Sequence, residues 1–165
     1  MQSRVIFVCL LLNVCLFSCD SKSVFDEYKT VPDVWPKNEI IDFKISAPDS
    51  INTYNLFVNL RNTNGYKYSN LFLVVEMEYP NGRTNKDTLE YKMAKPNGEL
   101  LGTGLTSIKE NKLWYKGYLK PFSFNESGEY IIKIQHAMRE NGEVKGIDNL
   151  EGVTDIGFRV EKQNN

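Results

Sequence analysis

The sequence has no cysteine after position 19, and its three cysteines, Cys9, Cys15 and Cys19, all lie near the N-terminus. A disulfide scaffold would spread its cysteines along the fold, because a bridge stabilises most when it closes a long loop. A zinc site needs clustered cysteine and histidine ligands, and this chain has one histidine, His136. We therefore expect no disulfide framework, no metal site and no other cofactor.

An apolar run long enough to cross a membrane as a helix is also missing. The longest apolar segment covers residues 5–17, which are 13 residues interrupted by Asn13, whereas a spanning helix needs about 20. Arg4 precedes the segment and gives it the layout of a secretory signal peptide. One interpretation is an ordinary secretory signal with three incidental cysteines, since cysteine behaves there as a small hydrophobic residue.

The end of this segment favours a second interpretation. Residues 16–19, Leu-Phe-Ser-Cys, resemble the lipobox of bacterial lipoproteins, where the signal peptide is removed and the new N-terminal cysteine is acylated. Phe17 departs from the small or β-branched residue usual at its position. Attachment of diacylglycerol and a further acyl chain such as palmitate at Cys19 would give lasting membrane attachment, because two or more chains are needed for it.

This interpretation divides the chain. Cleavage before Cys19 leaves 147 residues, which suits one domain. The segment from Ser21 to Asn38 is polar and contains Pro32 and Pro36, as expected of a tether, in which Trp35 is docked on the domain. We predict a lipoprotein signal peptide over residues 1–18, a lipidated N-terminus and tether over 19–38, a β-sandwich domain over 39–162 and a frayed C-terminus over 163–165.

An excess of charge of one sign is absent. The chain has 20 Lys and Arg residues against 21 Asp and Glu residues, interspersed along its length, and its formal net charge is −1. Nucleic-acid binding draws on clustered Lys and Arg, so we expect no nucleic-acid partner.

The sequence also lacks a convincing amphipathic helix, apart from a helical turn expected near residues 107–111. It has instead a series of segments in which apolar and polar residues alternate, the pattern of half-buried strands. Turn residues separate these segments. The pattern predicts an all-β fold, an antiparallel β-sandwich of about seven to eight strands. The expected strands lie in residues 41–45, 54–61, 70–79, 84–93, 113–124, 130–139 and 156–160.

Two local features are specific. Pro80-Asn81-Gly82 separates two alternating segments, so Tyr79 to Tyr91 is predicted to form a hairpin. Gly117 and Pro121 interrupt the aromatic segment LWYKGYLKPFSF, which predicts an edge position or a β-bulge there.

Residues arranged for catalysis are missing too. His136 falls on the apolar face of its predicted strand, so we expect a structural histidine, and no Gly-x-Ser-x-Gly motif surrounds any serine. The glycines of residues 97–104 have no following helix of adequate length and no Gly-Lys-Ser/Thr, so a loop is expected rather than a phosphate site. Glu76 and Glu78 oppose an apolar face, as on a solvated sheet surface. We predict that the protein is not an enzyme.

Exposed aromatic side chains offer one alternative function. Trp114, Tyr115 and Tyr118 could form a platform for sugar rings, although packing of at least one of them in the core is the simpler expectation. The alternative is therefore a carbohydrate-binding β-sandwich module on the cell envelope, with Trp114 and Tyr118 as candidate binding residues.

Several phrases of the sequence together resemble a known family, and the likeness runs over essentially the whole chain. Five segments after the lipobox cysteine carry this resemblance: VFDEYK, YNLFVNLRNTNGYKYSNLFLVVEMEYPNG, DTLEYKMA, GTGLTSIKENKLWYK and GVTDIGFRVEK. The chain resembles the GldH family of gliding motility lipoproteins of the Bacteroidetes. The family defines no binding residues that could be transferred, and Cys19 alone maps onto a functional position, the lipidation site.

The resemblance implies a function and partners. Members of the family are acylated envelope proteins needed for gliding and for the associated type 9 secretion machinery, with no catalytic activity assigned. The resemblance therefore implies that this protein is a membrane-anchored, non-catalytic component that assembles or stabilises the gliding and secretion machinery. Its expected partners are other gliding-motility lipoproteins and secretion-complex proteins, at the outer membrane or the periplasmic face of the inner membrane.

Overall fold

The computed structural model describes residues 22–31, 34–104 and 107–163, and these residues form ten β-strands and no α-helix. The strands are β1 (Ser23–Thr30), β2 (Val34–Pro36), β3 (Ile41–Ser46), β4 (Tyr54–Thr63), β5 (Asn70–Glu78), β6 (Thr84–Lys92), β7 (Ile108–Lys116), β8 (Glu129–His136), β9 (Asn149–Glu151) and β10 (Val153–Lys162).

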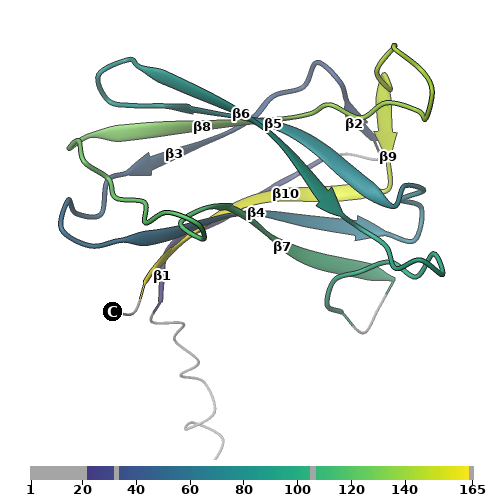
Figure 1. The fold of residues 1–165 in the computed structure, drawn as a ribbon, viewed down its shortest axis with the longest axis horizontal. Helices are drawn as coiled ribbons and strands as arrows, with labels where there is room; N and C mark the ends of the chain where they lie inside the picture. The colour runs from purple at the N-terminus through teal and green to yellow at the C-terminus, as the bar shows by residue number, and fades with distance from the viewer. Residues whose placement is uncertain (1–21, 32–33, 105–106, 164–165) are drawn as a thin grey trace, which may run out of the picture.

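Two four-stranded sheets pack face to face (Figure 1). The first sheet has the order β1-β10-β4-β7 and the second β3-β8-β5-β6, while β2 and β9 form a small third sheet. Neighbouring strands are antiparallel throughout these sheets. The predicted all-β sandwich is therefore confirmed, with more strands than the seven or eight expected.

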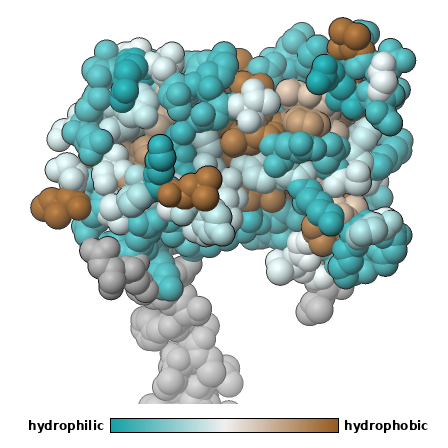
Figure 2. All heavy atoms as spheres, viewed as in Figure 1, coloured by the Kyte–Doolittle hydropathy of each residue, from teal (hydrophilic) through white to brown (hydrophobic). Residues whose placement is uncertain are grey.

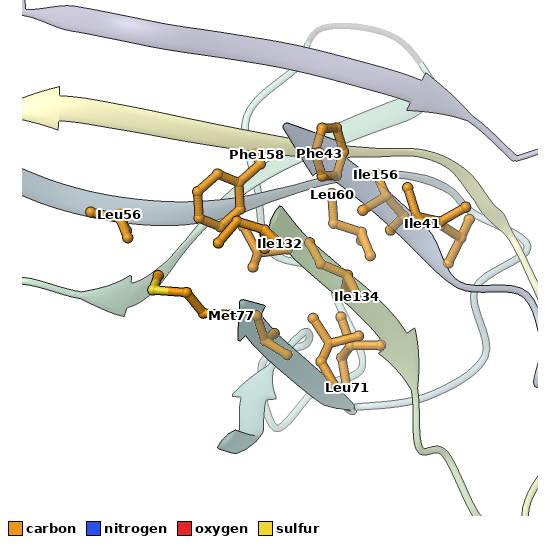
Figure 3. Close-up of a cluster of buried hydrophobic side chains, with 14 of the residues drawn as sticks. Ile41, Phe43, Leu56, Leu60, Leu71, Met77, Ile132, Ile134, Ile156 and Phe158 are labelled. Atoms are coloured by element: carbon orange, nitrogen blue, oxygen red, sulfur yellow. The ribbon is translucent and has the colours of Figure 1, made fainter. Parts of the chain in front are cut away.

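Hydrophobic side chains are sequestered between the two sheets, and the face in Figure 2 is hydrophilic over most of its area. Alternation along the strands creates this division, because successive side chains point to opposite faces. In β5, Leu71, Leu73, Val75 and Met77 are fully buried while the residues between them are partly exposed. The rings of Phe43 and Phe158 meet across the core with centroids 6.1 Å apart (Figure 3).

The predicted hairpin is confirmed. β5 and β6 pair from Asn70 with Lys92 to Glu78 with Thr84. The turn between them is closed by the Tyr79 amide, which donates to the Arg83 carbonyl at 2.8 Å. On the outer face of this sheet Glu76 and Glu78 lie beside cations: Lys86 is 2.8 Å from Glu76 and Lys133 is 2.9 Å from Glu78. They are thus part of a paired, solvated sheet surface, as expected.

The predicted tether over residues 19–38 is wrong for much of its length. β1 pairs with β10 from Ser23 to Thr30, so the sandwich begins at Ser23 rather than at residue 39. β2 pairs with β9, and Trp35 within it is fully buried, as expected for a docked indole. β1 was missed because an edge strand with one face on the solvent buries few large apolar residues, and its sequence is polar.

The predicted helical turn at residues 107–111 is also wrong. β7 begins at Ile108 and pairs with β4 along this segment. Its polar residues have specific partners in the sheet: the buried Asn111 amide donates to Asn62 Oδ1 at 2.8 Å. Such buried pairs replace the apolar alternation that identifies a strand in the sequence.

Candidate interaction surface

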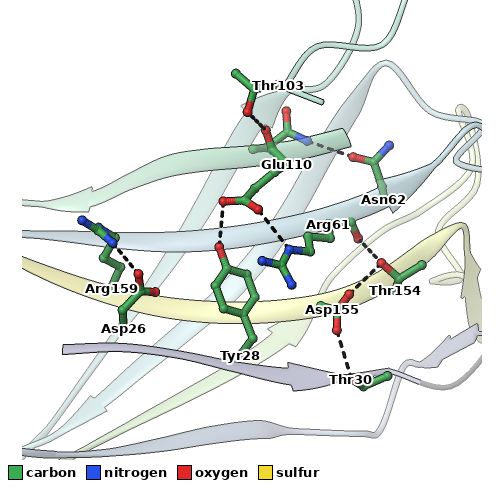
Figure 4. A network of polar contacts seen from close by, with 11 residues as sticks. Asp26, Tyr28, Thr30, Arg61, Asn62, Thr103, Glu110, Thr154, Asp155 and Arg159 are labelled. Carbon is green, nitrogen blue, oxygen red and sulfur yellow. Dashed lines mark hydrogen bonds and ion pairs between the residues drawn. The ribbon is translucent and has the colours of Figure 1, made fainter. Parts of the chain in front are cut away.

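The outer face of the first sheet carries a network of polar and aromatic side chains (Figure 4). Tyr28 of β1 donates its hydroxyl to Glu110 Oε1 of β7 at 3.0 Å, and Arg61 of β4 donates from Nε to Glu110 Oε2 at 3.0 Å. The Arg61 guanidinium also lies 4.0 Å from the centroid of the Tyr28 ring. One carboxylate therefore joins three strands of the sheet.

The network sets the charge state of its members. Burial and the neighbouring Glu110 carboxylate raise the pKa of Tyr28 to about 12. The hydrogen bond to Glu110 raises the pKa of Arg61. At neutral pH the phenol thus remains a hydrogen-bond donor and the guanidinium remains charged, and neither is suited to exchange protons with a substrate.

A second group of charges lies beside the first. Arg159 of β10 pairs with Asp26 of β1, and its Nε donates to Glu161 at 2.6 Å. Lys112 of β7 contacts the same Glu161 carboxylate at 2.6 Å. Burial opposes ionisation of Glu161, but the hydrogen bonds from Lys112 and Arg159 prevail and lower its pKa. Cations and carboxylates alternate across this face and compensate one another.

Aromatic rings continue this face toward one end of the sandwich. The centroids of Phe57 and Trp114 are 4.4 Å apart, and those of Trp114 and Tyr118 are 5.2 Å apart. Phe57 is buried, partly beneath Lys112, whose Nζ lies 4.1 Å from its ring centroid. Trp114 and Tyr118 remain 42% and 73% exposed. The two candidate binding residues are therefore adjacent and accessible.

A β-bulge explains why Trp114 faces outward and Tyr115 does not. The pairing of β4 with β7 goes from Phe57 with Trp114 to Leu56 with Lys116, so Tyr115 is the extra residue. Its ring turns to Phe158, at a centroid distance of 6.2 Å, and its hydroxyl donates to Asp87. The predicted edge position is confirmed, because β7 is the last strand of its sheet. The bulge lies at Tyr115, before Gly117, and the strand expected over residues 113–124 ends at Lys116, so that part of the prediction is wrong. One of the three candidate aromatics packs against the core.

Gly117 ends this strand in a way that requires glycine. Its φ is +100°, and a Cβ there would lie 2.4 Å from the Tyr54 carbonyl oxygen. Its own carbonyl accepts a hydrogen bond from the Gln163 side chain at 2.8 Å. The chain is thereby turned directly after β7, and the next residues, Tyr118 and Leu119, face the solvent.

Two exposed apolar residues at the same end of the sandwich as Trp114 and Tyr118 were not predicted from the sequence. Leu119 and Ile51 are each 89% exposed, in the loops after β7 and before β4. The Ile51 loop is fixed by Asp49, whose carboxylate accepts hydrogen bonds from the Tyr54 hydroxyl at 2.6 Å and from the Ile51 amide at 2.9 Å. These contacts, led by the one from Tyr54, hold the pKa of Asp49 well below its usual range. An isolated Leu between Gly117 and Pro121 was the available signal.

The other positions singled out in the sequence lie apart from this surface. His136 is 2% exposed, as expected of a structural histidine on the apolar face of β8. The glycine-rich residues 97–104 lie in the connection between β6 and β7, as expected of a loop. Cys19, the predicted lipidation site, lies outside the described residues.

Neither a cluster of metal ligands nor a membrane-spanning helix is found among the described residues. In residues 22–31, 34–104 and 107–163, no three or more His, Cys, Asp or Glu side chains are grouped so that they could hold a metal ion. Over the same residues, no helix has the length and apolar character needed to cross a membrane.

Comparison with known proteins identifies the family. The model of the GldH lipoprotein family matches residues 23–160, which span both sheets from the start of β1 into β10. The chain belongs to the GldH lipoprotein family. The boundaries of the match agree with the fold, because it begins at the first residue of β1 and therefore includes the strand that sequence reasoning assigned to a tether.

Two curated relatives extend the likeness over nearly the whole chain. The gliding motility lipoprotein GldH homolog of Christiangramia forsetii is 49% identical over 160 residues, 97% of this chain and 96% of the relative. The gliding motility lipoprotein GldH of Flavobacterium johnsoniae is 49% identical over 156 residues, 94% of this chain and 95% of the relative. Family membership implies a lipid-anchored envelope protein.

The match to solved structures is weak. A chain of the T13 IBDV viral particle aligns with a TM-score of 0.34 at 16% identity, over 87% of this chain and 32% of that chain.

Proposed function

We propose that this protein is a lipid-anchored, non-catalytic component of the gliding motility machinery that stabilises the assembly by binding protein partners. The observation that carries the proposal is the family match across the entire sandwich, together with relatives named for gliding motility. The partners we propose are other gliding-motility lipoproteins and proteins of the type 9 secretion complex.

The anchor in this proposal is Cys19, acylated after removal of residues 1–18. The motivation is the lipobox-like sequence at residues 16–19 and membership of a lipoprotein family. The sandwich begins at Ser23, only four residues later. The domain therefore works close to a membrane surface, on the outer membrane or the periplasmic face of the inner membrane.

A non-catalytic role is supported by how the described polar groups are used. Glu110 on the outer face is already paired with Arg61 and Tyr28. The single histidine is 2% exposed, so its imidazole is out of hydrogen-bond reach of a substrate bound at the surface. A general acid or base must instead lie within hydrogen-bond reach of its substrate.

The carbohydrate-binding alternative has less support. Trp114 and Tyr118 are exposed, but their ring planes are inclined at 46° to each other. The pair therefore offers no single flat face on which a sugar ring would stack. Calorimetric titration with envelope glycans would revive the alternative if binding were found in the wild type and lost in Trp114→Ala.

Deletion and crosslinking test the proposed function. We expect that deleting the gene abolishes colony spreading and reduces type 9 secretion, and that the wild-type gene restores both. We expect a tagged protein crosslinked in whole cells to retrieve envelope proteins of the same machinery. His136→Phe is the matched control for catalysis, and we expect it to restore spreading because no step depends on that imidazole.

Two results would contradict the proposal. One is normal gliding and secretion in the deletion strain. The other is a tagged protein that restores gliding but crosslinks to no envelope protein.

A further inference from the structure

One end of the sandwich gathers the first described residue, the end of the last strand and two loops. The Lys162 amide donates to the Lys22 carbonyl at 3.0 Å, and the Gln163 amide donates to the Thr53 carbonyl at 2.9 Å. The side chain of Gln163 also binds the Gly117 carbonyl. We call this the anchor end, because β1 begins there and the chain to Cys19 leaves from it. In Figure 1 it lies at the lower left, where β1 and β10 meet the C-terminus.

Exposed apolar side chains are concentrated at the anchor end. Eight large hydrophobic residues are exposed in the part of the chain that the structure describes. Five of them lie here, at the start of β1, in the loop before β4, near the end of β7 and in the loop after it. Figure 2 shows hydrophobic residues standing out from hydrophilic surroundings on this side of the molecule. The five are Val24 at 45%, Ile51 at 89%, Trp114 at 42%, Tyr118 at 73% and Leu119 at 89% exposure.

Lysines accompany these apolar residues. Lys120 follows Leu119 in the same loop and is exposed, and Lys162 at the end of β10 is exposed as well. Trp114, Tyr118 and Lys162 line one hollow of the surface together with Lys22. Hydrophobic residues that include Trp and Tyr, bordered by lysine, are typical of protein surfaces that sit at a membrane interface.

The length of the chain brings this end to the bilayer. Four residue steps separate Cys19 from Ser23, and a fully extended chain covers at most about 3.6 Å per residue. The Cα atom of Ser23 therefore cannot be more than about 14 Å from the Cα atom of Cys19, whose side chain would carry the lipid. This constraint acts on the anchor end alone, because the loop that carries the exposed Val144 lies at the opposite end (Figure 1).

We propose that the anchor end is a membrane-docking surface. In this arrangement Leu119 and Ile51 enter the boundary between headgroups and acyl chains, and Trp114 and Tyr118 lie at the headgroup level, where amphipathic rings are favoured. Lys120 and Lys162 face anionic headgroups. The occupant is the leaflet that holds the lipid anchor, so the inference rests on the proposed acylation of Cys19.

Docking of the anchor end would fix the orientation of the domain on the membrane. A lipid on a flexible chain fixes only the distance of a domain from the membrane, whereas insertion of two separate loops also fixes its tilt. The charged outer face of the first sheet would then stand away from the lipid at a defined angle, available to protein partners.

Site-directed spin labelling of the mature lipidated protein tests the inference. Leu119→Cys and Val144→Cys are a matched pair, because the two side chains are 89% and 90% exposed and lie at opposite ends. Each labelled protein is reconstituted in vesicles of phosphatidylethanolamine with a minority of phosphatidylglycerol. Flotation reports attachment, and collision rates with oxygen and with a water-soluble nickel complex report the depth of the label.

We expect both proteins to float, with the ratio of oxygen to nickel collisions several-fold higher at position 119 than at position 144. A label on Ile51→Cys should show the same high collision ratio as the label at position 119. Adding Leu119→Asp to the Ile51→Cys protein should make the label at position 51 more accessible to the nickel complex, while the protein still floats. Near-ultraviolet circular dichroism of each variant checks that the sandwich is intact.

Three results would overturn the inference. If the protein floats but position 119 is as water-exposed as position 144, then Cys19 is acylated but the anchor end does not enter the membrane. If position 119 is protected in native envelopes but not in pure vesicles, the surface binds a protein or a glycan instead. If the protein does not float, the anchor fails and the docking surface fails with it.

Discussion

His136 lies at the end of β8 with its imidazole packed edge-on against the Trp35 indole, at a centroid distance of 5.4 Å. Neither ring nitrogen has a hydrogen-bond partner among the described residues. Burial is the largest cause and lowers the pKa of His136 below its ordinary value of 6.5; the nearby Trp35 backbone opposes this shift, and the positive charge of Lys37 adds to it. The side chain is therefore neutral in the folded protein at neutral pH, and it serves as a packed ring between the small sheet and the core.

This environment makes folding stability depend on pH. The unfolded chain binds a proton near pH 6.5 and the folded chain only at lower pH, so stability is full above 6.5 and falls as the pH drops below it. The slope for one proton is at most about 1.4 kcal/mol per pH unit. We expect urea unfolding to show this loss between pH 7 and about pH 5, and His136→Phe to remove it. Equal losses in both proteins would contradict the assignment, since the chain has no other histidine.

At the scale of elements, β9 and β10 are joined by a turn that only glycine allows. Gly152 has a φ of +83°, and a Cβ there would lie 2.2 Å from the Tyr66 amide nitrogen, which belongs to the loop between β4 and β5. The Gly152 carbonyl in turn accepts a hydrogen bond from the Thr63 amide at 2.8 Å. The contact is between the backbones of the two segments, so a change of side-chain rotamer could not relieve a clash there.

We expect Gly152→Ala to destabilise the sandwich by at least about 3 kcal/mol, from the strained backbone and the clash together. Gly82→Ala is the matched control. Its φ is +81° but nothing lies within 4 Å of the added Cβ, so only the conformational cost of about 1 kcal/mol applies. Urea unfolding of both variants measures the difference, and equal losses would show that the contact with Tyr66 is unimportant.

The elements also show what sequence patterns can reveal. The hairpin of β5 and β6 was predictable because β5 has a water-facing side and a core-facing side, and Pro-Asn-Gly marks the turn. β1 and the start of β7 were not predictable, because both belong to edge strands whose polar side chains have hydrogen-bond partners on other strands. Tyr28 and Glu110 illustrate this: their hydrogen bond joins residues 82 positions apart. No local pattern contains that information.

At the scale of the whole molecule, the candidate surface was predictable only in part. The aromatic segment around Trp114 indicated exposed rings, and the Leu-Phe-Ser-Cys sequence indicated an anchor. Their proximity depends on the pairing of β1 with β10 and on the convergence of two loops, which the tertiary fold decides. Ile51 gave no signal, because an isolated exposed isoleucine resembles any loop residue until the fold brings it beside other apolar residues.

The account depends on the sulfur of Cys19, and mass spectrometry of the envelope protein tests it most directly. Trypsin cleaves after Lys22, so the mature N-terminus should be released as the short peptide of residues 19–22. We predict that this peptide carries diacylglycerol on its cysteine, and that Cys19→Ala accumulates as uncut precursor. A free thiol at Cys19, or a mature chain that still contains residues 1–18, would contradict the account.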